Sequence, residues 1–236
     1  MFVRAASFNV LADAYTGYGD YSHVDPALLL PGARTKAIIR LIDELRVDVI
    51  GLQEAEEPLK VAVEESDDWQ TFWSPKERGK ADGCLTLVRQ GLDVNRFDAY
   101  AYSDGSGHIV QSVQIGEVVF ANTHIKWAPA DSPDHFGVGQ AKELLSQFDP
   151  DQRAVIFADC NDRPKGPVRK LVEDAGFMNV YDEPTALVNG ELVALDLLAV
   201  RGVTARNVTK QYDLITIPNC FCPSDHIPVV AELEMY

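Results

Sequence analysis

Short apolar runs with few helical segments between them constrain the fold of this chain more than any other feature. Helical periodicity is confined to residues 33–46, 136–148 and 166–175. Because strands outnumber helices and several follow one another directly, the pattern favours two packed sheets with helices outside over a simple βα alternation. The predicted strands are 2–10, 47–54, 83–89, 108–115, 117–125, 153–159, 193–200 and 226–233.

The organisation of the chain is simple. No repeat, low-complexity tract or linker divides its 236 residues, so we expect a single domain over 1–236. Its four cysteines lack the paired spacing of a zinc site, and we expect them to be reduced. No apolar run approaches the length of a membrane span, and residues 1–10 look like a strand and not like a signal peptide. We therefore expect a cytoplasmic protein with no membrane contact and no obligate protein partner.

The net charge argues against a protein that coats long nucleic acids. The chain has 36 acidic and 21 basic residues, a formal net charge of −15. Proteins that bind long duplexes gain affinity by neutralising phosphates and are usually basic. A polyanionic substrate would here need a local basic patch or a bound metal.

Polar side chains that can bind metals recur where the apolar strands end. Each alone is typical of a turn or a cap, but together they suggest one centre. Asp196 differs from the others because it lies inside the apolar run LVALDLLAV, where a buried carboxylate needs a partner. The full set is Asn9, Gln53, Glu54, Asn122, His124, Asp159, Asn161, Asp196, Asp225 and His226.

The residue types in this set fit phosphoester hydrolysis. Glu54 is a hard oxygen ligand of the kind that Mg²⁺ prefers. Asp159 and Asn161 are two residues apart and face the same way on an extended segment, so one can orient water while the other donates to a phosphoryl oxygen. If Asp196 accepts from His226, its charge favours the protonated imidazole, a cation suited to developing phosphate charge.

Six motifs, in order along the chain, resemble those of the endonuclease/exonuclease/phosphatase superfamily. They are SFNVL, LQE, NTHIKWAP, ADCNDRP, LDLL and SDHIPVVAEL. NVLADAYT and DGCLTLVR further resemble its deadenylase, nocturnin and Angel branch. The resemblance implies an α+β fold, a four-layer α/β/β/α sandwich of two mixed sheets flanked by helices.

The resemblance also implies roles for the strand-end residues. Glu54 would be the main ligand of Mg²⁺, with Mn²⁺ as a possible substitute, helped by Asn9 and Asp225. Asp159 would position or activate the attacking water. His124 and Asn161 would contact the scissile phosphate or a second metal. His226, held by Asp196, would stabilise the transition state.

Two departures from the family pattern concern the substrate. Asp162 stands where the family often has a small residue, which we expect to place a negative charge near the phosphate site. Residues 187–191 lack the base-stacking aromatic residue of the deadenylases. The remaining candidates for substrate contact are Lys126, Trp127, Pro129, Arg163 and Lys165.

We expect the other basic residues and histidines to lie at the surface. These are Lys76, Arg78, Lys80, Arg169, Lys170, His23 and His108.

The sequence leaves three functions open. The first is a divalent-metal-dependent phosphodiesterase that trims RNA or oligonucleotide 3′ ends. The second uses the same centre as a phosphatase on a terminal or 2′,3′-cyclic phosphate of RNA. The third, a catalytically silent binding protein, predicts the loss of a centre residue, and all are present. A short or single-stranded RNA or nucleotide phosphoester is the expected substrate.

Overall fold

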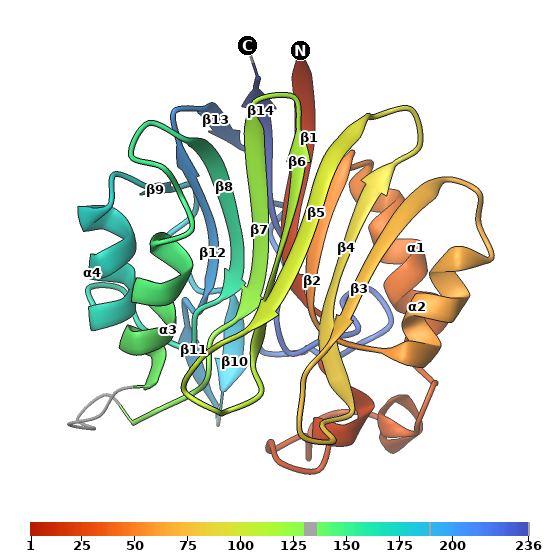
Figure 1. Ribbon diagram of the computed structural model, residues 1–236. Coiled ribbons are helices and arrows are strands. Elements are labelled where there is room, and N and C mark those ends of the chain that lie inside the picture. Colours follow the sequence, from red (N-terminus) through yellow and green to blue (C-terminus); the bar gives the residue numbers. More distant parts are fainter. Residues whose placement is uncertain (130–135, 189, 236) are drawn as a thin grey trace.

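Two mixed β-sheets pack face to face, and a pair of helices covers the outer face of each (Figure 1). The computed structural model describes residues 1–129, 136–188 and 190–235. The four-layer sandwich expected from the sequence is confirmed. No described helix is long and apolar enough to cross a membrane.

The first sheet joins the two ends of the chain. β1 runs parallel to β2 and antiparallel to β14, which makes the sheet mixed. Helices α1 (Thr35–Leu45) and α2 (Glu57–Glu64) cover its outer face. Its strand order is β13 (Thr204–Asn207), β14 (Val229–Glu234), β1 (Phe2–Asn9), β2 (Val49–Glu56), β4 (Asp82–Arg89) and β3 (Trp69–Pro75).

The second sheet is built around a parallel pair, β7 and β8. Helices α3 (Phe136–Leu145) and α4 (Pro167–Asp174) cover it, and a hairpin of β10 (Ala186–Val188) and β11 (Glu191–Val193) stands apart. Its strand order is β5 (Val94–Ala101), β6 (Ile109–Ile115), β7 (Val118–His124), β8 (Arg153–Asp159), β12 (Asp196–Arg201) and β9 (Met178–Asn179).

Side-chain alternation along the strands separates two kinds of core. In β1, Val3 and Ala5 pack between the sheets, whereas Ala6 and Phe8 pack under α1. The sheets approach closely at Gly51, where a Cβ atom would lie 2.7 Å from Phe157. Towards one end of the strands, the side chains that face the space between the sheets are polar. The candidate residues therefore point into that end of the space between the sheets.

The predicted elements are present, with one correction. The apolar run 193–200 does not form one strand: residues 191–193 belong to the β10–β11 hairpin, and Asp196 is the first residue of β12. Asp196 thus opens a strand and does not interrupt one. The structure adds α2 and the strands β5, β9, β10 and β13, and two 3-10 turns, Asp13–Tyr15 and Pro26–Leu29, lie inside the segment 13–32.

Candidate active site

Register aligns three candidate residues across the second sheet. His124 on β7 is paired with Asp159 on β8, and Asp159 is in turn opposite Asp196 on β12. All three side chains are buried. A row of one histidine and two carboxylates therefore faces the first sheet at the end of the core.

The first sheet contributes Asn9 and Glu54 to the same space. Asn9 ends β1 and pairs with Gln53 in β2. The pairing of β2 with β4 shifts between Leu52 and Ala55, and Glu54 takes a left-handed backbone with φ 55°. A bulge of this kind redirects a side chain. It turns Glu54, which simple alternation would place under the helices, towards the site.

Asn9 joins the two carboxylates. Its Nδ2 donates to Glu54 Oε1 at 3.1 Å and to Asp159 Oδ2 at 2.8 Å. Its own Oδ1 accepts from Leu11 N, and Glu54 Oε2 accepts from Ala12 N. The backbone beyond β1 and the Asn9 amide thus hold both acids in place.

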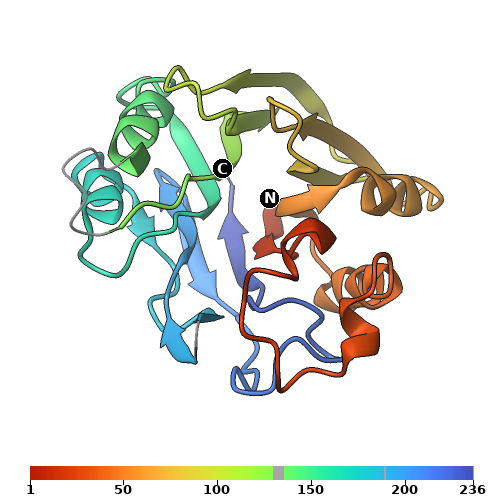
Figure 2. The ribbon, with the colours of Figure 1, turned by 90° about the horizontal axis from the view of Figure 1, so that it is seen from below.

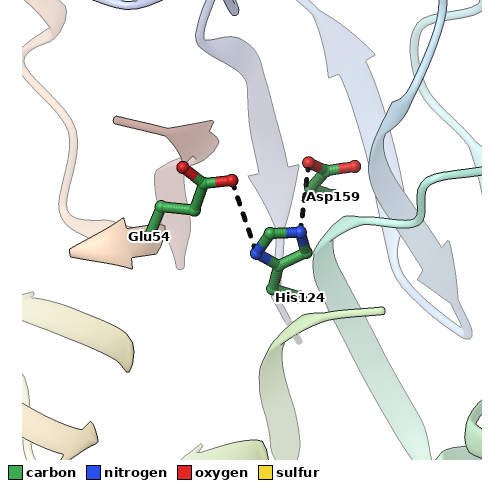
Figure 3. Close-up of side chains that lie close together, drawn as sticks. All are labelled: Glu54, His124 and Asp159. Atoms are coloured by element: carbon green, nitrogen blue, oxygen red, sulfur yellow. Dashed lines mark ion pairs between the residues drawn. The ribbon is translucent and has the colours of Figure 1, made fainter. Parts of the chain in front are cut away.

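His124 lies between the same two carboxylates (Figure 3). Its Nδ1 is 3.8 Å from Glu54 Oε1, and its Nε2 is 3.6 Å from Asp159 Oδ2. Lys76 Nζ is 3.2 Å from Nδ1, and Asn161 Nδ2 is 2.9 Å from Nε2. Burial and the charge of Lys76 hold the pKa of His124 well below its usual 6.5, so the ring is neutral.

Burial also alters the two acids. It raises the pKa of Glu54 to about 7, a shift that Lys76 limits and the charge of Asp225 increases. It raises the pKa of Asp159 to about 6, with His226 opposing the shift and Asp196 adding to it. The hydrogen bonds that these two carboxylates accept come from uncharged amide groups. Their negative charge is therefore incompletely balanced.

A divalent cation fits this arrangement. Glu54, His124 and Asp159 each offer one ligand atom, and these three atoms lie within 4.8 Å of one another. Among the described residues, these three form a candidate metal-binding group. Carboxylate oxygens are ligands for hard divalent cations, and a neutral imidazole can ligate a transition metal. A cation would also offset the charge that burial leaves on the two acids. The metal ligands predicted from the sequence, Asn9, Glu54 and Asp225, overlap this group at Glu54.

Asp196 and His226 form the predicted pair. His226 Nδ1 is 2.8 Å from Asp196 Oδ2, and its Nε2 is 3.9 Å from Asp159 Oδ2. Burial alone would lower the pKa of His226, but the charge and hydrogen bond of Asp196 raise it well above 6.5. Thr185 Oγ1 accepts from Asp196 N and fixes the start of β12. The site therefore contains one neutral and one cationic histidine.

Two loops close the site on the side of Asp225. The segment after β1, red in Figure 2, runs beside the blue segment that precedes β14. Buried Arg34 ties them by donating to Val10 O and Pro223 O. Tyr21 OH donates to Asp225 Oδ2 at 2.7 Å.

Asn161 and Asn122 have different roles. Asn161 has φ 47° directly after β8, and its backbone N–H donates to Asp159 Oδ1 while its Nδ2 donates to Ile125 O. Asn122 lies deeper, where it accepts from Gln53 and donates to the Leu52 carbonyl of the opposite sheet. Asn161 belongs to the site, whereas Asn122 and Gln53 form a polar layer beneath it.

The expected substrate contacts line one cavity beside this centre. The cavity has a volume of about 780 Å³ and also reaches Glu54, Asp159 and His226. Trp127 is 65% exposed at its rim, and Arg163 forms an exposed ion pair with Glu191. Its wall includes all five expected residues, Lys126, Trp127, Pro129, Arg163 and Lys165.

Three basic residues expected at the surface are buried. Lys76 pairs with buried Asp82, whose other oxygen accepts from Tyr15 OH. His108 Nδ1 donates to His124 O and its Nε2 accepts from Lys80 Nζ, and burial lowers the pKa of His108 to about 4. Arg169 lies behind β12, where it donates to Asp196 O. Each contacts at least one residue that is distant in the sequence: Lys76 and His108 contact His124, and Arg169 contacts Asp196.

Asp162 has a structural partner that the sequence analysis did not anticipate. Its Oδ2 accepts from Val168 N and Arg169 N, the free N–H groups of the first turn of α4. A Cβ atom at Gly166 would lie 1.8 Å from Asp162 Oδ1, so this approach requires glycine. The expected charge near the phosphate site is thus engaged by a helix N-terminus.

Sequence reasoning missed Lys76, Tyr15, Tyr21 and Ser224 as site residues. Ser224 Oγ donates to Asn9 O at 2.7 Å and links β1 to the Asp225–His226 pair. Its position before Asp225 is the one signal that could have drawn attention to it. A lysine and two tyrosines in loop segments carry no comparable signal.

The sequence of this chain matches the model of the Endonuclease/Exonuclease/phosphatase family over residues 6–226. The match ends at His226 of the site. The chain belongs to the endonuclease/exonuclease/phosphatase family. This family membership confirms the resemblance and makes the protein an enzyme of the hydrolase, phosphoesterase type. No curated protein sequence gives a significant match.

Solved structures of the same fold include two named family branches. The structure of ANGEL2, a 2′,3′-cyclic phosphatase, has a TM-score of 0.85 at 15% identity, over 99% of this chain and 95% of that chain. Its complex with adenosine-2′,3′-vanadate has a TM-score of 0.84 at 17% identity, over 99% of this chain and 95% of that chain. The human Nocturnin catalytic domain with bound sulfate has a TM-score of 0.74 at 18% sequence identity, over 100% of this chain and 95% of that chain. The fold is therefore shared across nearly the full chains.

Proposed function

We propose that this protein is a Mg²⁺-dependent phosphodiesterase that removes nucleotides from the 3′ end of RNA or oligonucleotides. The observation that carries this proposal is a second hollow, of about 470 Å³, that adjoins the first. Tyr15, Glu54, Asn161 and Val188 line both hollows. A phosphodiester has two ester arms, and a centre between two hollows can accept one arm on each side.

The acidic residues hold the metal and prepare the water. Glu54, with Asp159 and His124 beside it and Asp225 on the side of the second hollow, would hold Mg²⁺ or Mn²⁺. A bound cation would supply charge stabilisation to the phosphoryl oxygens. Asp159 orients the attacking water and accepts its proton, because its carboxylate lies beside both the metal group and His226 Nε2.

The other residues stabilise developing negative charge. Asn161 donates to a phosphoryl oxygen the amide hydrogen that faces His124 Nε2, while its other amide hydrogen stays on Ile125 O. His226, protonated because of Asp196, presents Nε2 towards Asp159 and the centre. Lys126, Arg163 and Lys165 attract the phosphates, while Trp127 and Pro129 offer apolar surface to a base.

One observation favours a second function, the hydrolysis of a 2′,3′-cyclic or terminal phosphate of RNA. The TM-score to ANGEL2, 0.85, exceeds the 0.74 to Nocturnin. The same centre can act on either bond, since both reactions transfer a phosphoryl group to water.

Short 5′-labelled RNAs with different 3′ ends test the proposal. We would compare a 3′-hydroxyl, a 3′-phosphate and a 2′,3′-cyclic phosphate, each with Mg²⁺ or Mn²⁺, and with Asp159→Ala as control. A metal-dependent ladder of shorter RNAs supports the exonuclease. Unchanged length with an opened or lost terminal phosphate supports the second function. No metal-dependent product from any RNA contradicts both.

A further inference from the structure

The two hollows that meet at the centre differ in charge. The larger one, which we call the basic hollow, is lined by Lys76, Lys80, Lys126, Arg163 and Lys165. The smaller one, which we call the tyrosine hollow, has no lysine or arginine among its described lining residues. Its ionisable carboxyl groups are Asp20, Glu54 and Asp225, and its tyrosines are Tyr15, Tyr18 and Tyr21. It also contains the imidazole of His23, whose Nε2 is held 2.8 Å from Ile217 O.

The tyrosine hollow suits a flat, uncharged group. The hydroxyl groups of Tyr15 and Tyr21 are engaged by Asp82 and Asp225, which leaves their rings as wall. Tyr18 packs edge-on against Tyr15, with ring centroids 6.1 Å apart, and is 84% exposed. An exposed ring at the mouth of a hollow can stack on a nucleobase.

Asp20 gives the tyrosine hollow a negative rim. Its carboxylate accepts from Ser22 N at 3.1 Å, and the hydroxyl and backbone N–H of Ser22 together lower the pKa of Asp20. Carboxylates accept hydrogen bonds from ribose hydroxyls but repel a phosphate. The rim therefore distinguishes a free hydroxyl end from a phosphorylated one.

We propose that the tyrosine hollow binds the terminal nucleoside of the RNA with its free 2′- and 3′-hydroxyls, and excludes a 3′-phosphorylated end. The basic hollow then takes the phosphates of the remaining chain. This inference rests on the proposed function and assigns Tyr18 and Asp20 as specificity residues.

The placement fixes which bond breaks. With the terminal nucleoside in the tyrosine hollow, water forms a bond to the scissile phosphorus and the bond to the preceding 3′-oxygen breaks. That oxygen leaves with a proton as a new 3′-hydroxyl in the basic hollow. The products are a nucleoside 5′-monophosphate and an RNA that is one residue shorter.

The test compares rates on one RNA ending in a 3′-hydroxyl and the same RNA ending in a 3′-phosphate. The variants are Asp20→Asn, which keeps an oxygen for Ser22 N, Asp20→Lys and Tyr18→Ala. Asp67→Lys makes the same change of charge on an exposed residue that lines neither described hollow.

We expect the wild-type protein to prefer the 3′-hydroxyl about tenfold or more, since like charges repel in the tyrosine hollow. The Asp20 variants should reduce that preference by accelerating the 3′-phosphate substrate, whereas Asp67→Lys should not. Tyr18→Ala should raise KM for the 3′-hydroxyl RNA and leave kcat nearly unchanged.

Equal wild-type rates on the two ends would overturn the inference, as would equal preferences in Asp20→Lys and Asp67→Lys. Removal of the 3′-phosphate at constant RNA length would also overturn it, because that phosphate would then occupy the centre. These outcomes all include metal-dependent turnover. Failure of the proposed function is different, because the 3′-hydroxyl RNA would then not be shortened.

Discussion

Asp159 and Asp196 stand directly opposite each other on antiparallel β8 and β12, and His226 contacts both. Two buried carboxylates on neighbouring strands repel each other, and a shared cation relieves that repulsion. The closer contact, 2.8 Å from His226 Nδ1 to Asp196 Oδ2, fixes the ring so that Nε2 points to Asp159. The imidazolium is thus both a stabilising element of the site and a candidate catalytic cation.

Asp196→Asn should lower turnover by about ten- to a hundredfold, because the variant removes the charge that keeps His226 protonated. Loss of the proton should be greatest at high pH. The alkaline limb of the pH–rate profile should therefore move to lower pH. Asp174→Asn, which alters an exposed ion pair with Lys170, is the control. A wild-type profile in Asp196→Asn would contradict the role of the pair.

Glu54 makes the metal-free protein less stable at high pH. Its pKa is about 7 in the folded state and 4.5 in the absence of burial. Ionisation therefore opposes folding by an amount that is absent well below pH 4.5, grows as the pH rises and is complete above about 7.

Glu54→Gln should consequently abolish metal-dependent turnover while stabilising the metal-free protein. The gain should be about 3 kcal/mol at pH 8 and about 1 kcal/mol at pH 5. Denaturant titrations in the presence of a chelator measure both values. Glu65→Gln, at an exposed position, should show neither effect. A Glu54→Gln variant that is no more stable than wild type at pH 8 would contradict the unfavourable burial.

The chain reveals the sheets and most of the centre because both are encoded locally. Short apolar runs mark β1, β7 and β8, and polar residues at their ends mark Asn9, His124 and Asp159. Register then brings those ends together without further information. The Asp196–His226 contact was also foreseeable, because a carboxylate in an apolar run needs a partner.

The remaining features depend on contacts between distant segments. Lys76 looks like a surface lysine until the β3–β4 connection folds it against Asp82 and His124. The bulge that turns Glu54 into the site has no residue signature, since a positive φ is uncommon for glutamate. The charge difference between the two hollows likewise follows from loops whose paths the sequence does not specify.

Lys76→Met should destabilise the protein by about 3–5 kcal/mol, because it leaves the Asp82 carboxylate buried without a cation. The double variant Lys76→Met/Asp82→Asn should recover much of that stability but not the activity. Denaturant midpoints and turnover, measured on the wild type, Lys76→Met, Asp82→Asn and the double variant, separate the two effects. Additive losses of stability in the double variant would contradict a direct pair.

Arg34→Met should loosen the two loops beside Asp225. The change removes the donors to Val10 O and Pro223 O, at a cost of about 1–3 kcal/mol for each unsatisfied buried carbonyl. We expect a lower denaturation midpoint and, at temperatures where the variant is folded, a reduced rate. Arg40→Met, in α1, serves as the comparison. An Arg34→Met protein as stable as the Arg40→Met variant would show that the tie is unimportant.

Our proposal makes the group of Glu54, His124 and Asp159 a metal-dependent centre for phosphoester hydrolysis. Its most direct test is one preparation assayed on a short 3′-hydroxyl RNA after removal of metal, and again after addition of Mg²⁺ or Mn²⁺. The account predicts no turnover without metal, full recovery on addition, and no recovery in Asp159→Ala. Turnover that persists in the chelated protein, or that survives in Asp159→Ala, would contradict it.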